Sequence, residues 1–254
     1  MAVNNELVNK IQEWADKYET ASFIIDDPIR FPRKYSGRDA EVSGFITSWL
    51  SFGSRKMIIR AAEKLDKEFD GSPYEWLMDR RYINYKGNPK KVYRFLSYYD
   101  LYKLCDRLRS LYIGFKTMED MVLTPPERPL VVKLTYLFSG INGIPVCIMD
   151  GSACKRLCMF LRWMVRKDSP VDLGIWRNVN PKDLIIPLDV HVHKMALELG
   201  LTSRKKADMK AAIEVTEAMR QIFPEDPTRG DFALFGHGIE REREILTKKI
   251  KVIT

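Results

Sequence analysis

Apolar residues recur every three or four positions along almost the whole of this 254-residue chain, and alternation with a period of two is scarce. This spacing is typical of helices that each bury one face. Turn-forming stretches such as TPPERP and INGIP separate the periodic segments. A series of short helices of this kind predicts an all-α globule. The expected helices cover residues 4–18, 38–50, 54–69, 73–79, 90–96, 98–113, 117–122, 128–139, 153–166, 190–199, 204–222 and 239–248.

Composition excludes several classes of protein. A hydrophobic content of 45% with 12 Phe, 11 Tyr and 5 Trp is too apolar for a disordered chain. No run approaches the ~18 apolar residues of a membrane span. The N-terminal segment is acidic and lacks the plan of a signal peptide, which predicts a cytoplasmic protein. The net charge of +8 favours polyanionic partners such as nucleic acid, although a basic protein without that role fits the charge equally well.

The four cysteines are Cys105, Cys147, Cys154 and Cys158. They form no C-x-x-C pair, and a reducing compartment disfavours disulfides. Their spacing matches no zinc site. We therefore expect small core residues at these positions.

The segment 149–167 is the first candidate for function. Gly151 and Ser152 indicate a loop that leads into a helix, with Ser152 as the predicted N-cap. Free backbone N–H groups at such a helix start can hold a phosphate. At 100° per residue, Lys155, Arg162 and Arg166 fall on one narrow stripe opposite the apolar face. The alternative is an ordinary solvated helix face.

The segment 185–201 is the second candidate. As a helix it places Asp189 at the N-cap, where the positive end of the helix dipole favours a negative charge. A carboxylate fixed there can stabilise a developing cation nearby, although a purely structural cap is the alternative. As a strand, the same segment would align Asp189, His191 and His193 as metal ligands, with His237 as a further donor.

These two segments resemble the helix-hairpin-helix DNA glycosylase superfamily, which includes endonuclease III and the 8-oxoguanine glycosylases. The stretch 150–153 matches the hairpin turn, and Lys155 matches the lysine position. KRLCMFLRW, residues 155–163, is similar to the lysine helix of a bacterial and archaeal 8-oxoguanine glycosylase branch. PLDVHVHKMALELGL, residues 187–201, resembles the aspartate stretch, with Asp189 at the aspartate position and Lys194 at a basic position after it.

A weaker match lies earlier in the chain. Residues 41–65 resemble the early helix pair of the superfamily, with Phe52 at the joint where relatives carry an intercalating glutamine. The chain departs from the superfamily at Ala153, which replaces the second hairpin glycine. It also has an additional segment at 167–184 and lacks the four-cysteine iron–sulfur loop. The sequence therefore resembles a divergent, uncharacterised bacterial family within this superfamily.

The resemblance implies two helical lobes with a cleft between them. One lobe, residues 35–165, is a six-helix bundle that carries the hairpin; residues 1–34 and 166–254 form the other. Lys155 and Asp189 are expected to face each other across the cleft. The implied activity is a DNA glycosylase with abasic-site lyase activity acting on a damaged base such as 8-oxoguanine. Lys155 would be the nucleophile, and Asp189 would stabilise the sugar cation.

The implied partner is double-stranded DNA with a damaged base, bound by a monomer without membrane, metal or cofactor. Two other classes stay open: a non-catalytic DNA-binding protein that retains the hairpin fold, and a metal-dependent hydrolase. The residues expected to contact DNA are Gly151, Ser152, Arg156, Arg162, Arg166 and Lys194. Those expected to stack on a base are Phe52, Trp163 and Trp176.

Overall fold

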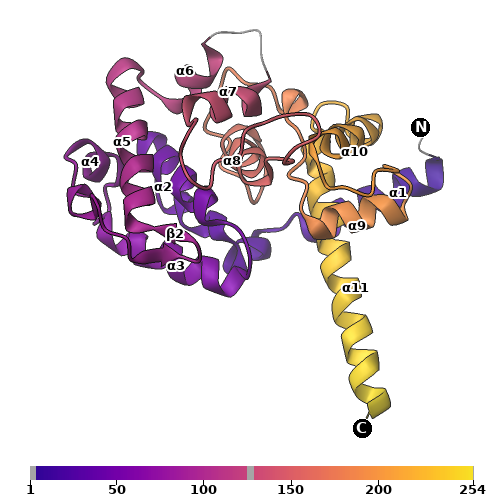
Figure 1. Ribbon diagram of the computed structural model, residues 1–254. Coiled ribbons are helices and arrows are strands. Elements are labelled where there is room, and N and C mark those ends of the chain that lie inside the picture. Colours follow the sequence, from indigo (N-terminus) through magenta and orange to yellow (C-terminus); the bar gives the residue numbers. More distant parts are fainter. Residues whose placement is uncertain (1–3, 125–128, 254) are drawn as a thin grey trace.

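The computed structural model describes residues 4–124 and 129–253, and it confirms the predicted all-α fold (Figure 1). Within those ranges no helix has the length and apolarity needed to cross a membrane. Short 3₁₀ turns lie at Ala21–Asp26, Pro28–Arg30, Pro32–Lys34, Ile83–Tyr85, Pro181–Asp183 and Pro227–Arg229. The α-helices are α1 (Asn5–Tyr18), α2 (Gly37–Leu50), α3 (Arg55–Glu68), α4 (Pro73–Met78), α5 (Tyr98–Gly114), α6 (Met118–Leu123), α7 (Leu130–Leu137), α8 (Lys155–Val165), α9 (Val190–Glu198), α10 (Met209–Ile222) and α11 (Gly230–Ile253).

Side-chain caps fix several of these helix starts. A capping box begins α5, where Ser97 and Asp100 satisfy each other's backbone N–H groups. Thr117 and Asp120 form the same arrangement at α6. Asp208 caps α10 by accepting a hydrogen bond from Ala211 N at 2.9 Å. Each cap stabilises its helix by about 1 kcal/mol and sets where the helix begins.

Helices α2 to α8 form one packing group around α2. Every residue of α2 from Ala40 to Leu50 is buried, so this helix is enclosed on all sides. It packs against α8, α3 and α4. The ring centroid of Phe45 lies 4.3 Å from that of Phe138 and 5.2 Å from that of Phe160, which joins α2 to α7 and α8.

A second group of helices brings the two ends of the chain together. Helices α1 and α9 both pack along α11, and α10 lies beside them, while the C-terminal half of α11 projects away from the body (Figure 1). Trp14 of α1 stacks on His237 of α11, with ring centroids 3.8 Å apart. The N-terminal helix therefore belongs to the same packing group as the C-terminal third.

The prediction of a helix at 90–96 is wrong. These residues form a two-stranded antiparallel hairpin of β1 (Lys91–Tyr93) and β2 (Leu96–Ser97) that contacts α3 and α5. Asn88 and Pro89 precede it, and Arg94 takes a left-handed conformation with φ 47° at its tip. A short apolar run does not distinguish a strand from a helix, and a turn at Arg94 ends any helical path.

The boundaries of two C-terminal helices also differ from prediction. Helix α10 begins at Met209 and not at 204, because Asp208 caps it. Helix α11 begins at Gly230 and not at 239. This earlier start places Asp231 in the first turn of α11.

Candidate functional site

A cleft of about 1120 Å³ lies where the two helix groups meet. Its lining includes the α2–α3 joint, the loop 142–145, the first turn of α8, the start of α9 and the first half of α11. Lys155 and Asp189, which are 34 positions apart in the sequence, both line it, together with Asp231. Chemically versatile side chains from three different helices therefore converge on one open space.

Lys155 is the first residue of α8 and is partly buried. Its Nζ lies 3.5 Å from the Met159 sulfur one turn later. Among the described residues no carboxylate lies within ion-pair distance of it. The N-cap is Cys154, in a left-handed conformation with φ 49°, so the prediction of Ser152 as N-cap is wrong. Ser152 instead accepts a hydrogen bond from Cys154 N at 3.1 Å and lines the cleft.

Asp189 is the N-cap of α9, as predicted. Its Oδ1 accepts hydrogen bonds from His191 N and Val192 N, each at 2.9 Å. The side chain is partly exposed and is held at the positive end of the helix dipole. The position favours a fixed negative charge at the wall of the cleft.

The helical conformation of α9 separates the residues of the strand-based metal site. His193 hydrogen-bonds through Nε2 to Arg204 O at 2.8 Å. His191 packs edge-on against Phe235, and its Nδ1 lies 3.4 Å from Glu242. In the described ranges no three His, Cys, Asp or Glu side chains gather as a metal site would require. The alternating spacing at 189–193 was therefore a poor predictor of a shared face.

Asp231 is a site residue that the sequence analysis missed. It lies in the first turn of α11, is only 8% exposed, and accepts a hydrogen bond from Arg162. Burial raises the pKa of its carboxyl to about 6, with Arg162 opposing the shift and Asp189 adding to it. The signal was an acidic residue directly after Gly230, where a helix can begin.

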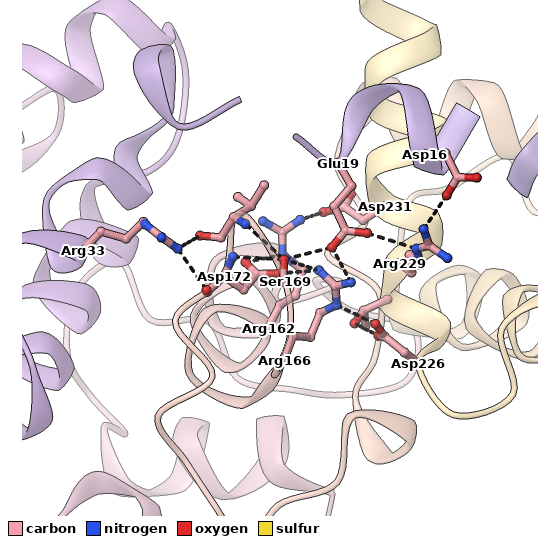
Figure 2. A network of polar contacts seen from close by, with 12 residues as sticks. Asp16, Glu19, Arg33, Arg162, Arg166, Ser169, Asp172, Asp226, Arg229 and Asp231 are labelled. Atoms are coloured by element: carbon pink, nitrogen blue, oxygen red, sulfur yellow. Dashed lines mark hydrogen bonds and ion pairs between the residues drawn. The ribbon is translucent and has the colours of Figure 1, made fainter. Parts of the chain in front are cut away.

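The prediction that Arg162 and Arg166 form an exposed phosphate-binding stripe is wrong. Each is only 3% exposed, and both belong to a network of ion pairs (Figure 2). Arg162 Nε lies 3.3 Å from Asp172 Oδ1, and Arg162 also pairs with Asp231. Arg166 pairs with Asp172 at 2.5 Å, Glu19 at 2.7 Å and Asp226 at 2.8 Å.

This network joins α8 to the second helix group. Its carboxylates come from the end of α1, the loop after α8, the segment that leads into α11 and the first turn of α11 (Figure 2). Arg229 extends it to Glu19 at 3.0 Å and Asp16 at 2.5 Å. Burial of a charge costs desolvation free energy unless the charge is paired, so these arginine side chains link the two helix groups and do not meet solvent.

The remaining predicted DNA-contacting residues are distributed unevenly. Arg156 lines the cleft but donates to the backbone oxygens of Trp49 and Gly143, and burial lowers the pKa of its guanidinium to about 10. Lys194 is exposed and lies 3.5 Å from Glu242, outside the cleft lining. Gly151 lies in the turn before α8, where an added Cβ would collide with the Ile148 side chain.

Only one of the three predicted stacking residues is accessible from the cleft. Trp163 and Trp176 are 0% and 1% exposed, so the prediction that they stack on a base is wrong. Trp176 donates through Nε1 to Glu41 at 2.7 Å inside the core. Phe52, at the α2–α3 joint, is partly exposed and lines the cleft.

The cysteines are free, and Cys105, Cys154 and Cys158 are buried, as expected for small core residues. Cys147 is partly buried. Burial raises the pKa of the Cys105 and Cys158 thiols, which makes them poor nucleophiles.

Comparison with known proteins gives one result. A family model described as protein of unknown function (DUF2400) matches residues 27–240. No curated protein and no solved structure matches the chain. The matched region contains Lys155, Asp189 and Asp231 and almost all of the cleft lining.

Proposed function

The chain belongs to the DUF2400 family of unknown function, and we propose that it is a DNA glycosylase with abasic-site lyase activity. The observation that carries this proposal is the convergence of Lys155, Asp189 and Asp231 on one cleft. Within the described part of the chain, Lys155 has no ion-pair partner that would occupy its amine, and an imine-forming enzyme needs a lysine amine that is free to react. The resemblance of residues 155–163 and 187–201 to DNA glycosylases independently supports the same two residues.

The cleft is large enough to admit a nucleotide that has left a duplex. Its volume of about 1120 Å³ exceeds the ~300–1,000 Å³ of ordinary small-molecule sites. An enzyme that acts on a base within DNA must first rotate that nucleotide out of the stack. We infer that the base and its sugar enter this space and that the rest of the duplex stays outside.

Lys155 is the proposed nucleophile. Its neutral amine attacks C1′ of the flipped nucleotide, so a bond from Nζ to C1′ forms as the bond from C1′ to the base breaks. The departing base takes up a proton, and opening of the sugar ring leaves an imine on Lys155.

The two carboxylates divide the remaining work in this proposal. Asp189, held by two backbone N–H groups, stabilises the positive charge that develops on the sugar. Burial raises the pKa of the Asp231 carboxyl to about 6, so in this proposal Asp231 holds a proton more readily than Asp189 and delivers it to the leaving base. Groups whose environments differ in this way commonly serve as an acid and a charge stabiliser in one site.

The proposed substrate is double-stranded DNA that contains a damaged purine such as 8-oxoguanine, and the proposed working form is a cytoplasmic monomer. Because Arg162 and Arg166 are buried, the DNA phosphates must bind to other groups. We assign it to the backbone of Gly151 and Ser152 and to exposed cations at the cleft. Arg243 of α11 is one such cation in the cleft lining.

An excision assay on a panel of lesion-bearing duplexes tests this proposal. The purified protein is incubated with duplexes that each carry one damaged base, and the released base and strand breaks are measured. We expect release of at least one damaged base by the wild type. Lys155→Gln should reduce the single-turnover rate by at least ~100-fold, because the amine is lost.

Lys194→Gln is the matched control, because it removes a lysine outside the cleft and should leave excision unchanged. DNA binding by the wild type without release of any base would instead identify a non-catalytic DNA-binding protein. Excision that persists in Lys155→Gln would show that another residue supplies the nucleophile.

A further inference from the structure

The β1–β2 hairpin forms part of the rim of the cleft. Tyr93 donates a hydrogen bond to the Phe52 carbonyl, and Lys91 Nζ donates to Phe95 O at 3.0 Å. Gly53, with φ 87°, allows the Arg94 guanidinium to lie directly against the α2–α3 joint. The tip of the hairpin therefore packs against the α2–α3 joint, which lines the cleft.

Two phenylalanines from these different elements lie together at that rim. The ring centroid of Phe52 is 4.9 Å from that of Phe95, and both residues line the cleft. The guanidinium of Arg156 lies 4.7 Å from the Phe52 ring centroid, and this cation–π contact holds the Phe52 ring in place. Phe95 is 51% exposed, so part of its ring remains open to solvent.

The surroundings of Phe95 are basic. Residues 86–99 contain four cations, and no carboxylate occurs before Asp100, which is held in the capping box of α5. Within the described part of the chain, none of these cations forms an ion pair, and all four are exposed. An exposed aromatic ring among unpaired cations is typical of surfaces that bind nucleic-acid strands. The four cations are Lys86, Lys90, Lys91 and Arg94.

We propose that Phe95, supported by Phe52, is the surface on which an unpaired DNA base stacks while the neighbouring nucleotide occupies the cleft. This inference rests on the proposed function, because it assumes that the ligand is DNA. The cations of the hairpin bind the flanking phosphates, and the aromatic ring replaces the stacking partner that base flipping removes. The left-handed backbone at Arg94 keeps the tip tight enough to present the ring at the rim.

A tryptophan substitution reports the stacking directly. Phe95→Trp is titrated with a duplex that carries one tetrahydrofuran abasic-site analogue opposite adenine, and tryptophan emission is compared with that of the wild type. Four of the five native tryptophans are at most 2% exposed, and the fifth, Trp14, is stacked on His237, so the difference spectrum isolates position 95. We expect strong quenching on binding. Phe95→Ala should bind this duplex about 10-fold more weakly.

Tyr99→Trp and Tyr99→Ala are the matched controls, because Tyr99 is an exposed aromatic residue on α5 that does not line the cleft. We expect no quenching and unchanged affinity for them. Salt-dependent binding by the wild type combined with wild-type affinity in Phe95→Ala would overturn the stacking proposal and leave the proposed function standing. Failure of the wild type to bind the duplex at all would overturn both.

Discussion

The carboxyl group of Asp231 is buried beside Arg162 and lines the cleft, which is an unusual environment for an acidic side chain. Its pKa of about 6 exceeds the ordinary value of 3.8, so the folded protein binds the proton more tightly than the unfolded chain. The stability that this proton contributes is complete below about pH 4 and is lost as the pH rises through 6. The same group therefore couples the chemistry of the cleft to the stability of the fold.

We expect Asp231→Asn to abolish this pH dependence. Between pH 4 and 6, the unfolding free energy of the wild type should fall relative to that of the variant by up to about 1.4 kcal/mol per pH unit. Urea titrations of both proteins across this range measure the difference, and asparagine retains an oxygen that accepts from Arg162. Parallel pH profiles would show that the carboxyl does not titrate in this window.

Arg166 should contribute to stability and not directly to DNA binding. Arg166→Ala leaves Glu19, Asp172 and Asp226 without a central cation, and breaking a buried pair costs about 3–5 kcal/mol. Urea denaturation measures this loss. Lys194→Ala removes an exposed pair and should cost at most about 1 kcal/mol. Equal small losses in both variants would contradict the structural role of the network.

Local sequence patterns predict the roles of some site residues and not of others. Helical periodicity correctly placed Arg162 and Arg166 on one face of α8, but it carried no information on what that face contacts. The Arg166 partners Glu19 and Asp226 lie 147 residues before and 60 residues after it in the sequence. The N-cap role of Asp189 was predictable, since caps depend on neighbours two or three positions away.

At the scale of elements, the hairpin and the α2–α3 joint depend on each other through Gly53. We expect Gly53→Ala to destabilise the protein more than Gly71→Ala, as measured by the change in Tm. Both glycines have positive φ, but an added Cβ at Gly53 meets the Arg94 guanidinium, whereas at Gly71 nothing lies within 4 Å. The difference between the variants reports this contact, and equal losses would show that the hairpin tip is not seated on the joint.

Most helices were predictable as elements, including the short α4 and α6, whereas the segment 90–96 and the first turns of α11 were not. The segments α2, α3 and α5 begin and end within a residue of their predicted bounds. The hairpin was missed because seven residues carry too little periodicity to separate strand from helix. The first turns of α11 were missed because GDFALFG contains two glycines, which lowers helix propensity although burial against α1 stabilises the helix there.

At the scale of the whole molecule, a charge of +8 predicts salt-dependent binding to duplex DNA. If ~4–6 phosphates are neutralised, the slope of log affinity against log salt should be about −4 to −5. Fluorescence anisotropy with a labelled duplex measures this slope between about 50 and about 200 mM salt. Affinity that does not weaken over this range would exclude phosphate contacts as the basis of binding.

The arrangement of two helix groups around a cleft depends on long-range pairing. Periodicity alone establishes only that the chain is all-α. The cleft also needs the loop between α7 and α8, the segment between α8 and α9, and the ion-pair network that joins them. These contacts connect distant parts of the chain, so local sequence patterns do not predict them.

Borohydride trapping tests whether Lys155 forms an imine with DNA, because only such an imine is reduced to a stable protein–DNA adduct. The wild type should form a covalent complex with a duplex that contains an abasic site. Lys155→Gln should form none while still binding the same duplex, and Asp189→Asn should fold, bind and trap at least ~100-fold more slowly. An adduct that forms equally well in Lys155→Gln would contradict the assignment of Lys155 as the nucleophile.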